Sequence, residues 1–300
     1  ILFNENEFKN IKGTGTSHSI YLYFNSMINK TITGIKLKNI HSADGFLCIR
    51  TDDEIETNFT FYKLYFYNVR QNGGGAINVD NPENKTYILI FEECYFDSNE
   101  NIDGGSLLIN QDTFPYCRGL SLIFSDMHFN SATGRGGVLA AFIDGDINII
   151  DCNFNLNKAE IGGGSIYIEN NGQSKCNCNI LESNFNRNNG QNAYCIWVNV
   201  LSYDDDFTLQ ITCNFANNND EKSGSGACIL SNCKTTKIFS SEFIANEIEY
   251  QCGGVNVTAK GILEVEDCTF YKCNSGTIEG SYGGGIGYNY MSDTTRIFLP

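Results

Sequence analysis

A repeat of about 30 residues runs along most of the chain and limits the folds that the chain can adopt. Each copy has a phenylalanine, usually with asparagine three residues later, then a variable link and a glycine pair followed by alternating apolar residues, as in CNFNLNKAEIGGGSIYIE (152–169). The phenylalanines stand at positions 66, 96, 129, 154, 185, 215, 243 and 270. A fixed period of this length is typical of solenoids, in which each repeat forms one structural unit.

Alternating apolar residues follow each glycine pair, and a second alternating set precedes most of the phenylalanines. A period of two predicts strands with one buried face, and no stretch shows the pattern of an amphipathic helix. One short repeat cannot bury that face alone, whereas stacked copies bury it continuously, so we predict an all-β right-handed parallel β-helix (solenoid) of about 9–10 coils. The inward-facing pairs after the glycines are expected to be Ile77/Val79, Leu107/Ile109, Leu139/Ala141, Ile166/Ile168, Cys195/Trp197, Cys228/Leu230, Val255/Val257 and Ile286/Tyr288.

The repeated residues are expected to build the scaffold. The phenylalanines would form a column inside the coils, and the glycines would allow sharp corners. Asparagine tolerates turn conformations, so one turn would carry a stack formed by Asn99, Asn157, Asn188, Asn218 and Asn246. We expect a single β-helix domain over 1–300, with degenerate coils in 1–60, regular coils in 61–290 and the end of the fragment in 291–300.

The paired F-x-x-N and G-G-x-[ILV] motifs, such as CNFNLN (152–157) with GGGSIYI (162–168), resemble the repeats of polymorphic outer-membrane proteins. Similar repeats occur in large families of surface proteins of single-celled eukaryotes. The resemblance covers roughly residues 60–290 and departs from the pattern at Ala132, at the Asn192-Ala193 corner and in the first 60 residues. It implies a β-helical passenger displayed outside the cell and associated with adhesion, with no catalytic residues. No membrane barrel or anchor is visible in this sequence.

The chain has 13 cysteines, and most are expected to be core residues. Four of them stand two residues before a motif phenylalanine, in every second coil: Cys94, Cys152, Cys213 and Cys268. These four would lie about 9–10 Å apart, which is too far for a disulfide. Cys195 and Cys228 would stack on adjacent coils and form the candidate disulfide pair. A further group is expected at loops or corners, where its members could pair: Cys117, Cys233, Cys252 and Cys273.

The charge works against a nucleic-acid partner, and the sequons give slight support for secretion. The 20 basic residues are outnumbered by 35 acidic ones, a net charge of −15, which works against nucleic-acid binding. No apolar run reaches the roughly 18 residues that a membrane span needs. Four N-x-[ST] sequons are possible glycosylation sites, at Asn29, Asn58, Asn84 and Asn256, the last of which is expected to point outward. The expected location is extracellular or at the cell surface, as a secreted glycoprotein or adhesin.

An enzyme is the main alternative, because parallel β-helices also carry polysaccharide lyases and hydrolases. Such sites need carboxylates clustered on one face, usually with a basic residue or Ca²⁺. Asp80 and Glu169 share one strand-end position, but Phe142 interrupts this column, and the three histidines fall in different coils. We therefore assign no catalytic, cofactor-binding or metal-binding residue.

The strand after the glycines carries a stripe of apolar residues on its outward side, which a scaffold role does not require. Its outward residues in five consecutive coils are expected to be apolar: Leu108, Ala140, Tyr167, Ile196 and Ile229. Either a long loop covers this stripe, with the inserts at 111–119 and 199–206 available, or the stripe is an interface for a partner.

The sequence thus predicts a non-enzymatic surface or extracellular β-helical protein with an adhesion or structural-assembly role. Its partner would be a protein or glycan at a cell surface, or copies of the chain itself, and no cofactor is implied. Two alternatives stay open. One is a carbohydrate-active β-helix enzyme, and the other is an intracellular structural component, which the buried thiols would suit.

Overall fold

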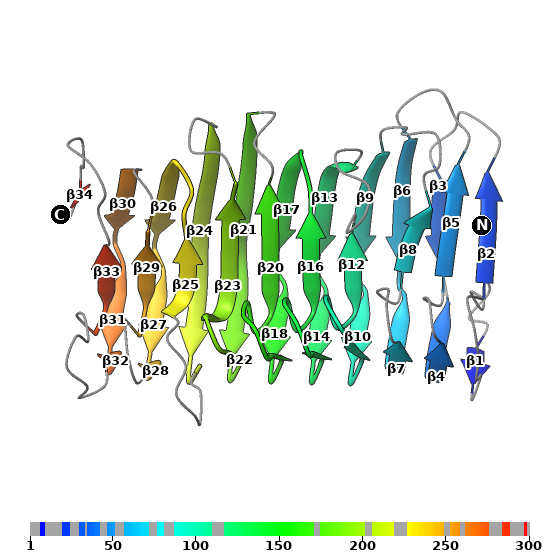
Figure 1. Cartoon of the computed structure of the whole chain (residues 1–300), viewed down its shortest axis with the longest axis horizontal. Coiled ribbons are helices and arrows are strands. Elements are labelled where there is room, and N and C mark those ends of the chain that lie inside the picture. The colour runs from blue at the N-terminus through cyan, green and yellow to red at the C-terminus, as the bar shows by residue number, and fades with distance from the viewer. Residues whose placement is uncertain are drawn as a thin grey trace.

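The structure of the chain is a computed structural model that describes residues 7–9, 20–24, 30–33, 35–42, 47–51, 57–71, 77–80, 87–109, 117–170, 175–201, 206–218, 227–248, 253–258, 262–275, 284–288 and 297–298. Every regular element in these residues is a β-strand, and every strand pairing is parallel. Figure 1 shows the coils stacked side by side in chain order, with the two termini at opposite ends of a rod. The predicted parallel β-helix is confirmed.

The strands form two long sheets and one small pair. The ten-stranded sheet takes one strand from each coil, in the order β2 (Ile20–Phe24), β5 (Leu47–Thr51), β8 (Ile77–Asp80), β12 (Leu107–Ile109), β16 (Leu139–Phe142), β20 (Ile166–Asn170), β23 (Ala193–Val200), β25 (Ala227–Ser231), β29 (Val255–Val257) and β33 (Ile286–Tyr288). The small pair consists of β28 (Glu247–Ile248) and β32 (Asn274–Ser275).

The 22-stranded sheet bends around the rest of each coil. Its strands are β1 (Glu7–Lys9), β3 (Lys30–Thr33), β4 (Lys36–Ser42), β6 (Thr57–Tyr62), β7 (Tyr65–Gln71), β9 (Tyr87–Glu92), β10 (Tyr95–Asp97), β11 (Glu100–Asn101), β13 (Cys117–Ile123), β14 (Asp126–His128), β15 (Ser131–Ala132), β17 (Asp146–Ile150), β18 (Asn153–Asn155), β19 (Lys158–Ala159), β21 (Cys176–Asn186), β22 (Asn189–Gly190), β24 (Phe207–Ala216), β26 (Thr235–Phe239), β27 (Glu242–Ile244), β30 (Ile262–Glu266), β31 (Thr269–Tyr271) and β34 (Ile297–Phe298). Six consecutive coils, from β9 to β29, are described over most of their length.

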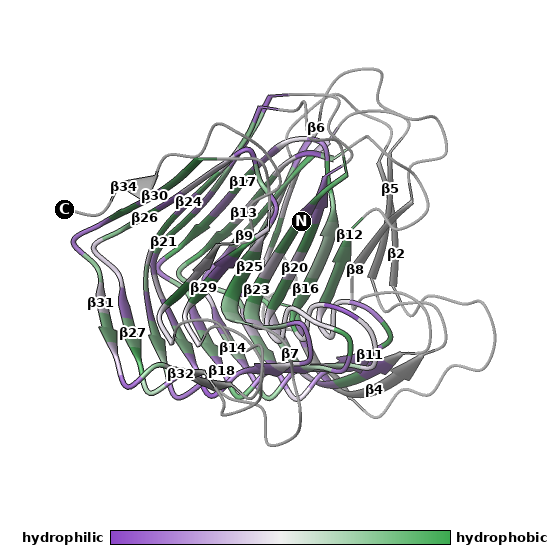
Figure 2. Cartoon of the chain, turned by 60° about the vertical axis from the view of Figure 1, so that its left-hand side comes forward, coloured by the Kyte–Doolittle hydropathy of each residue, from purple (hydrophilic) through white to green (hydrophobic). Residues whose placement is uncertain are grey.

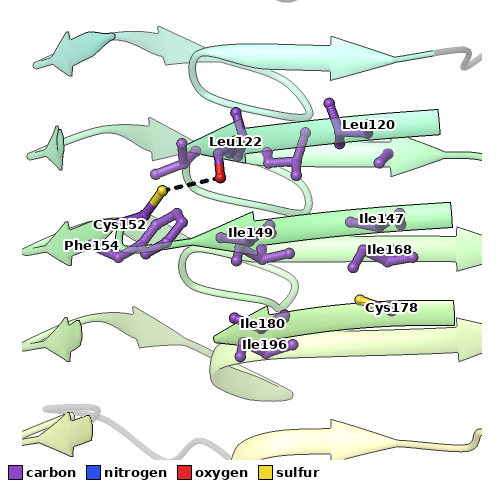
Figure 3. Close-up of a cluster of buried hydrophobic side chains, with 14 of the residues drawn as sticks. Leu120, Leu122, Ile147, Ile149, Cys152, Phe154, Ile168, Cys178, Ile180 and Ile196 are labelled. Carbon is purple, nitrogen blue, oxygen red and sulfur yellow. Dashed lines mark hydrogen bonds between the residues drawn. The ribbon is translucent and has the colours of Figure 1, made fainter. Parts of the chain in front are cut away.

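The interior is a continuous apolar core that both sheets enclose. Strand β9 alternates buried and half-buried residues, as a period of two requires. Figure 3 shows side chains from neighbouring coils meeting inside, including Ile149, Ile168 and Ile180. Figure 2 shows hydrophobic residues concentrated along β16, β20, β23 and β25. The coils are therefore held together by burial along the whole rod, which no single repeat could achieve.

The aromatic column forms inside as predicted, except at one coil. The rings of Phe154, Phe185, Phe215, Phe243 and Phe270 stack with centroid separations of 4.6, 4.9, 4.8 and 4.7 Å. Offset or parallel stacking of this kind adds to the stabilisation from burial.

The prediction that Phe129 lies in this column is wrong. Met127 pairs in register with Phe96 on one side and Phe154 on the other, and it is fully buried. Phe129 instead has a φ of +52° and is 56% exposed. The inner position needs a large apolar side chain rather than a ring, and the flexible thioether of Met127 fills it.

The same shift brings Asn130 into the predicted asparagine column, so Ala132 is no departure from the repeat. The column consists of Asn99, Asn130, Asn157, Asn188, Asn218 and Asn246, all of which are buried. Asn157 shows the pattern: its Oδ1 accepts from the backbone N–H and the Nδ2 of Asn130, at 3.0 and 3.1 Å. Its Nδ2 donates to the carbonyl of Met127 and to Oδ1 of Asn188, at 3.0 and 3.1 Å. Each amide thus ties three coils together.

Corners on either side of the short strands use left-handed backbone conformations without glycine. Among the described residues, fifteen other than glycine have positive φ, including Glu93, Ser98, Asp151 and Leu156. The backbone N–H groups of most of them donate to a carbonyl of the next coil, as when Glu93 donates to Ile123 O at 3.1 Å. Hydrogen bonding between coils therefore continues through the bend and offsets the cost of the left-handed conformation.

A cysteine–serine column occupies the corner before the short strands: Cys94, Ser125, Cys152, Ser183, Cys213, Ser241 and Cys268. The backbone N–H of each of the first three cysteines donates to the serine Oγ of the next coil, at 3.0, 3.1 and 3.0 Å. The cysteine thiols donate to carbonyls of the preceding coil, such as Cys152 Sγ to Leu122 O at 3.4 Å (Figure 3). The prediction that these cysteines face inward in every second coil is confirmed.

Candidate binding site on the outer face of the ten-stranded sheet

The apolar stripe predicted to face solvent does not exist in that form. Ile196 pairs in register with Ile166, and Ile229 pairs with Ile196; both lie fully buried in the core. Figure 3 shows Ile196 beside Ile180. The outward positions in their coils belong instead to Trp197 and Leu230, which the sequence analysis had placed inside.

The register of the pairing explains this error. Strands β20 and β23 pair without a shift, so Ile196, Trp197 and Val198 lie beside Ile166, Tyr167 and Ile168. The segment NAYCIWV (192–198) therefore aligns residue for residue with GGGSIYI (162–168), and the inward pair of that coil is Ile196/Val198 rather than Cys195/Trp197. Ile229 faces inward for the same reason, because it pairs with Ile196.

The other three residues of the stripe point outward but are covered by the chain itself. Leu108, Ala140 and Tyr167 are 9%, 0% and 1% exposed, and they form a small outer cluster with Phe142 and Trp197. The alternative of an exposed partner interface is therefore wrong for these residues. The inserts expected to cover them lie partly outside the described residues, at 110–116 and 202–205; the described residues that contact the cluster come from the glycine turns.

Arg135 provides the cover, from the position just before a glycine pair. Its guanidinium lies 4.7 Å from the ring centroid of Tyr167 and 5.0 Å from that of Phe142. It forms a salt bridge with Asp103 at 3.2 Å, and its backbone N–H donates to Asp103 Oδ1 at 2.6 Å. Asp103 holds the same place before the glycine pair of the preceding coil, so the two charges stack between coils. A cation on aromatic faces, paired with a buried carboxylate, fixes the turn over the sheet.

Glycine is required in these turns. Gly104, Gly136 and Gly163 have φ values of +59°, +66° and +63°, and a Cβ at each would lie within 2.4 Å of a backbone oxygen. Gly162 takes the place of Asp103 and Arg135 in the third coil, and a Cβ there would lie 2.7 Å from the indole of Trp197. The missing side chain thus leaves room for the tryptophan.

Glu169 and two amides complete the site. Tyr167 donates its hydroxyl to Glu169 Oε2, and Arg135 approaches that oxygen to 3.8 Å. Asn199 donates to the same oxygen at 3.2 Å, and Asn232 donates to Asn199 Oδ1 at 3.1 Å. Arg135 is 26% and Glu169 15% exposed at the side chain. The result is a fixed polar network that still reaches solvent.

Burial and charge set the protonation of this network. Burial raises the pKa of Tyr167 to about 12, and its hydrogen bond to Glu169 acts in the same direction. Burial alone would lower the pKa of Arg135, but the hydrogen bond and charge of Asp103 outweigh it and raise that pKa. The tyrosine therefore remains a neutral donor and the arginine a cation near neutral pH.

The remaining predicted residues lie elsewhere. Asn58 stands half-buried in β6, whereas Asn29 and Asn84 lie outside the described residues. Asn256 does point outward from its coil, but it is 3% exposed, so the prediction of an accessible glycosylation site there is wrong. Phe142 and Glu169 pair in register at the strand end, as predicted from the repeat, whereas the side chain of Asp80 lies outside what the structure describes.

The described cysteines are free thiols, and nine of the eleven are buried. Cys195 and Cys228, the candidate disulfide pair, are both fully buried, and a hydrogen bond between their thiols raises the pKa of Cys228 further than burial alone does. Cys117 and Cys233 lie in the core rather than at exposed loops, and Cys252 lies outside the described residues. Cys273 takes the asparagine position of its coil, where Asn246 Nδ2 approaches its Sγ to 4.0 Å.

Sequence reasoning missed Asp103 and Arg135, although the repeat held the signal. When the glycine pairs are aligned, opposite charges occupy the same position in adjacent coils, and the third coil has glycine there. Opposite charges at matched positions of neighbouring parallel strands or turns are placed for an ion pair.

No family model, curated protein or solved structure matches the chain. Within the described residues, no helix is long and apolar enough to span a bilayer, and no three side chains of the types that bind metals come together.

Proposed function

We propose that the chain is a non-enzymatic β-helical protein of the cell surface or extracellular space, with an adhesion or structural-assembly role. The single observation that carries this proposal is the network of Arg135, Glu169, Asn199 and Asn232 around the half-buried Trp197, which we call the outer patch. It combines fixed polar groups with an aromatic surface on a rigid scaffold. Ligand-binding sites commonly combine aromatic side chains with a few fixed polar groups.

Asparagine ladders on the 22-stranded sheet support the scaffold role. Asn184 donates to Asn153 Oδ1 and Asn214 donates to Asn184 Oδ1, both at 3.0 Å, and all three side chains are exposed. Ladders of identical side chains flatten and stiffen parallel sheets. A stiff rod suits a protein that holds a binding site at a set distance from its attachment.

Binding to the source cells tests the proposal. An antibody against the chain should stain cells that have not been permeabilised, and the labelled chain should bind to them. Glu169→Gln should weaken that binding, whereas Lys237→Ala, which breaks an ion pair with Glu264 on the other sheet, should leave it unchanged. Staining only after permeabilisation would contradict the proposal and support an intracellular structural component, the alternative that the free thiols favour.

A carbohydrate-active enzyme is the second candidate, because the outer patch also holds a carboxylate beside a tyrosine hydroxyl and an arginine. Incubation with acidic polysaccharides, with and without Ca²⁺, would reveal it through new reducing ends or unsaturated products. Release that Glu169→Gln abolishes would replace the adhesion proposal with this one.

A further inference from the structure

We infer that the outer patch binds a neutral carbohydrate through a pair of adjacent hydroxyl groups, with the sugar ring lying against Trp197. This inference rests on the proposed function, since it names the ligand class of the same patch. It follows from three properties of the described residues: the hydrogen-bonding groups left over, the aromatic surface beside them and the local charge.

The network leaves one acceptor and one donor side by side. All contacts of the Glu169 carboxylate among the described residues go to Oε2, from Tyr167, Asn199 and Arg135. The network therefore holds Oε1 in place, and within the described part of the chain its lone pairs are available to a ligand. The Asn199 amide uses one of its two N–H groups on Glu169, and Asn232 orients it from the other side.

A carboxylate oxygen next to an amide N–H matches two neighbouring hydroxyl groups. One hydroxyl donates to Glu169 Oε1, and the other accepts from Asn199 Nδ2. Both protein groups are oriented before binding, so little side-chain entropy is lost when the ligand arrives. A bond to the ionised carboxylate is also stronger than a bond between neutral groups.

Trp197 supplies the apolar surface that a sugar ring needs on one side. It is the only tryptophan in the chain, and it remains partly exposed on the outer cluster. Gly162 packs closely against one side of its indole, and Tyr167 meets it edge to face at a centroid distance of 5.1 Å. The ring is thus fixed in orientation, as in binding sites where aromatic side chains carry most of the contact area.

Charge argues for a neutral sugar rather than an acidic one. The patch contains the carboxylate of Glu169 and the guanidinium of Arg135, and that guanidinium is already paired with the adjoining carboxylate of Asp103. The whole chain carries a net charge of −15. A sugar carboxylate or sulfate placed beside Glu169 Oε1 would meet repulsion at short range.

The single tryptophan gives a direct test on the full chain. Its fluorescence is titrated with the methyl glycosides of mannose, galactose, glucose and N-acetylglucosamine, with glucuronic and sialic acid as charged comparators, and saturation-transfer NMR checks each signal. We expect at least one neutral glycoside to bind saturably, and the acids to bind at least tenfold more weakly. Lack of response to all four neutral glycosides, or tighter binding of an acid, would overturn the inference.

Asn199→Ala and Asn179→Ala form a matched pair of variants. Both residues donate an amide to the preceding coil, Asn199 to Glu169 at 3.2 Å and Asn179 to Asn148 at 3.0 Å, but only Asn199 lies in the patch. Asn199→Ala should raise the dissociation constant of the glycoside at least tenfold while Asn179→Ala leaves it unchanged. Equal effects would refute the inference.

The two proposals can fail separately. Cell binding that Asn199→Ala does not affect would leave the adhesion role standing and remove the carbohydrate as its ligand. Glycoside binding without any binding to cells would do the reverse.

Discussion

Replacement of Asn157 by alanine should strongly destabilise the coil stack. The side chain makes four hydrogen bonds in the interior, two of them accepted from Asn130 and two donated, to Met127 O and Asn188 Oδ1. Alanine would leave three buried groups without these partners: the backbone N–H of Asn130, one N–H of its amide and the carbonyl of Met127. The fourth group, Asn188 Oδ1, keeps the backbone N–H of residue 157 at 3.0 Å.

The expected loss follows from those three groups. A buried polar group without a partner costs about 1–3 kcal/mol, so Asn157→Ala should lower the free energy of unfolding by about 4 kcal/mol. That is a large fraction of the roughly 5–15 kcal/mol that stabilises a domain. Urea-induced unfolding measures it, followed by far-UV circular dichroism and by tryptophan fluorescence, which together show whether all coils unfold as one unit.

Asn184→Ala is the matched control. Asn184 also bonds amides of both neighbouring coils, but it is exposed, so water replaces what is lost and the change should stay within about 0.5 kcal/mol. Equal losses for the two variants would refute the reasoning, because they would show that burial of the amide column contributes nothing.

Three further predictions concern the core, the outer patch and the thiols. Met127→Ala should cost about 3 kcal/mol by leaving a cavity, whereas Phe129→Ala should change stability by less than about 0.5 kcal/mol; urea unfolding would show the opposite order if Phe129 were the core residue. Arg135→Ala should cost about 2 kcal/mol, because it leaves the nearly buried Asp103 carboxylate without its cation, against about 0.5 kcal/mol or less for Lys237→Ala. Burial raises the pKa of the first three thiols of the cysteine–serine column from 9.0 to about 12. Because the unfolded thiols lose their protons first, the contribution of these thiols to the free energy of unfolding should be constant below pH 9 and should fall as pH rises toward 12, by about 1.4 kcal/mol per thiol and pH unit. Urea unfolding under reducing conditions measures this contribution. A free energy of unfolding that does not fall between pH 9 and 10.5 would contradict the prediction.

The architecture could be predicted from the sequence because the same features that specify it occur in every repeat. Alternation, turn asparagines and glycine corners recur in coil after coil, so one misread copy does not change the fold. Reading by residue identity failed where two neighbouring residues were both apolar: Phe129 has the ring, but Met127 has the spacing to Asn130 that the stack requires. An exposed phenylalanine at a corner cannot be recognised until the hydrogen-bonded register is known.

The outer patch could be predicted only in part. Tyr167 and Glu169 fall on outward positions of β20 by simple alternation. The outward position of Trp197 could not be predicted, because its coil lacks the glycine pair from which the alternation is counted in the other coils. The cover by Arg135 depends on how a glycine turn folds back over the sheet, and this path is set by contacts between coils rather than within one.

Cysteine and serine alternate at one corner of the rod. This position therefore repeats every two coils, whereas the rest of the motif recurs in every coil. Neighbouring coils are otherwise alike, so a folding chain could dock a segment one coil out of place and still bury apolar residues. Such a slip would set cysteine against cysteine and remove the bonds from each cysteine N–H to a serine Oγ. Mispairing is the characteristic failure of repeat proteins. The column therefore acts as a check on assembly order, in which a thiol and a hydroxyl distinguish odd coils from even ones.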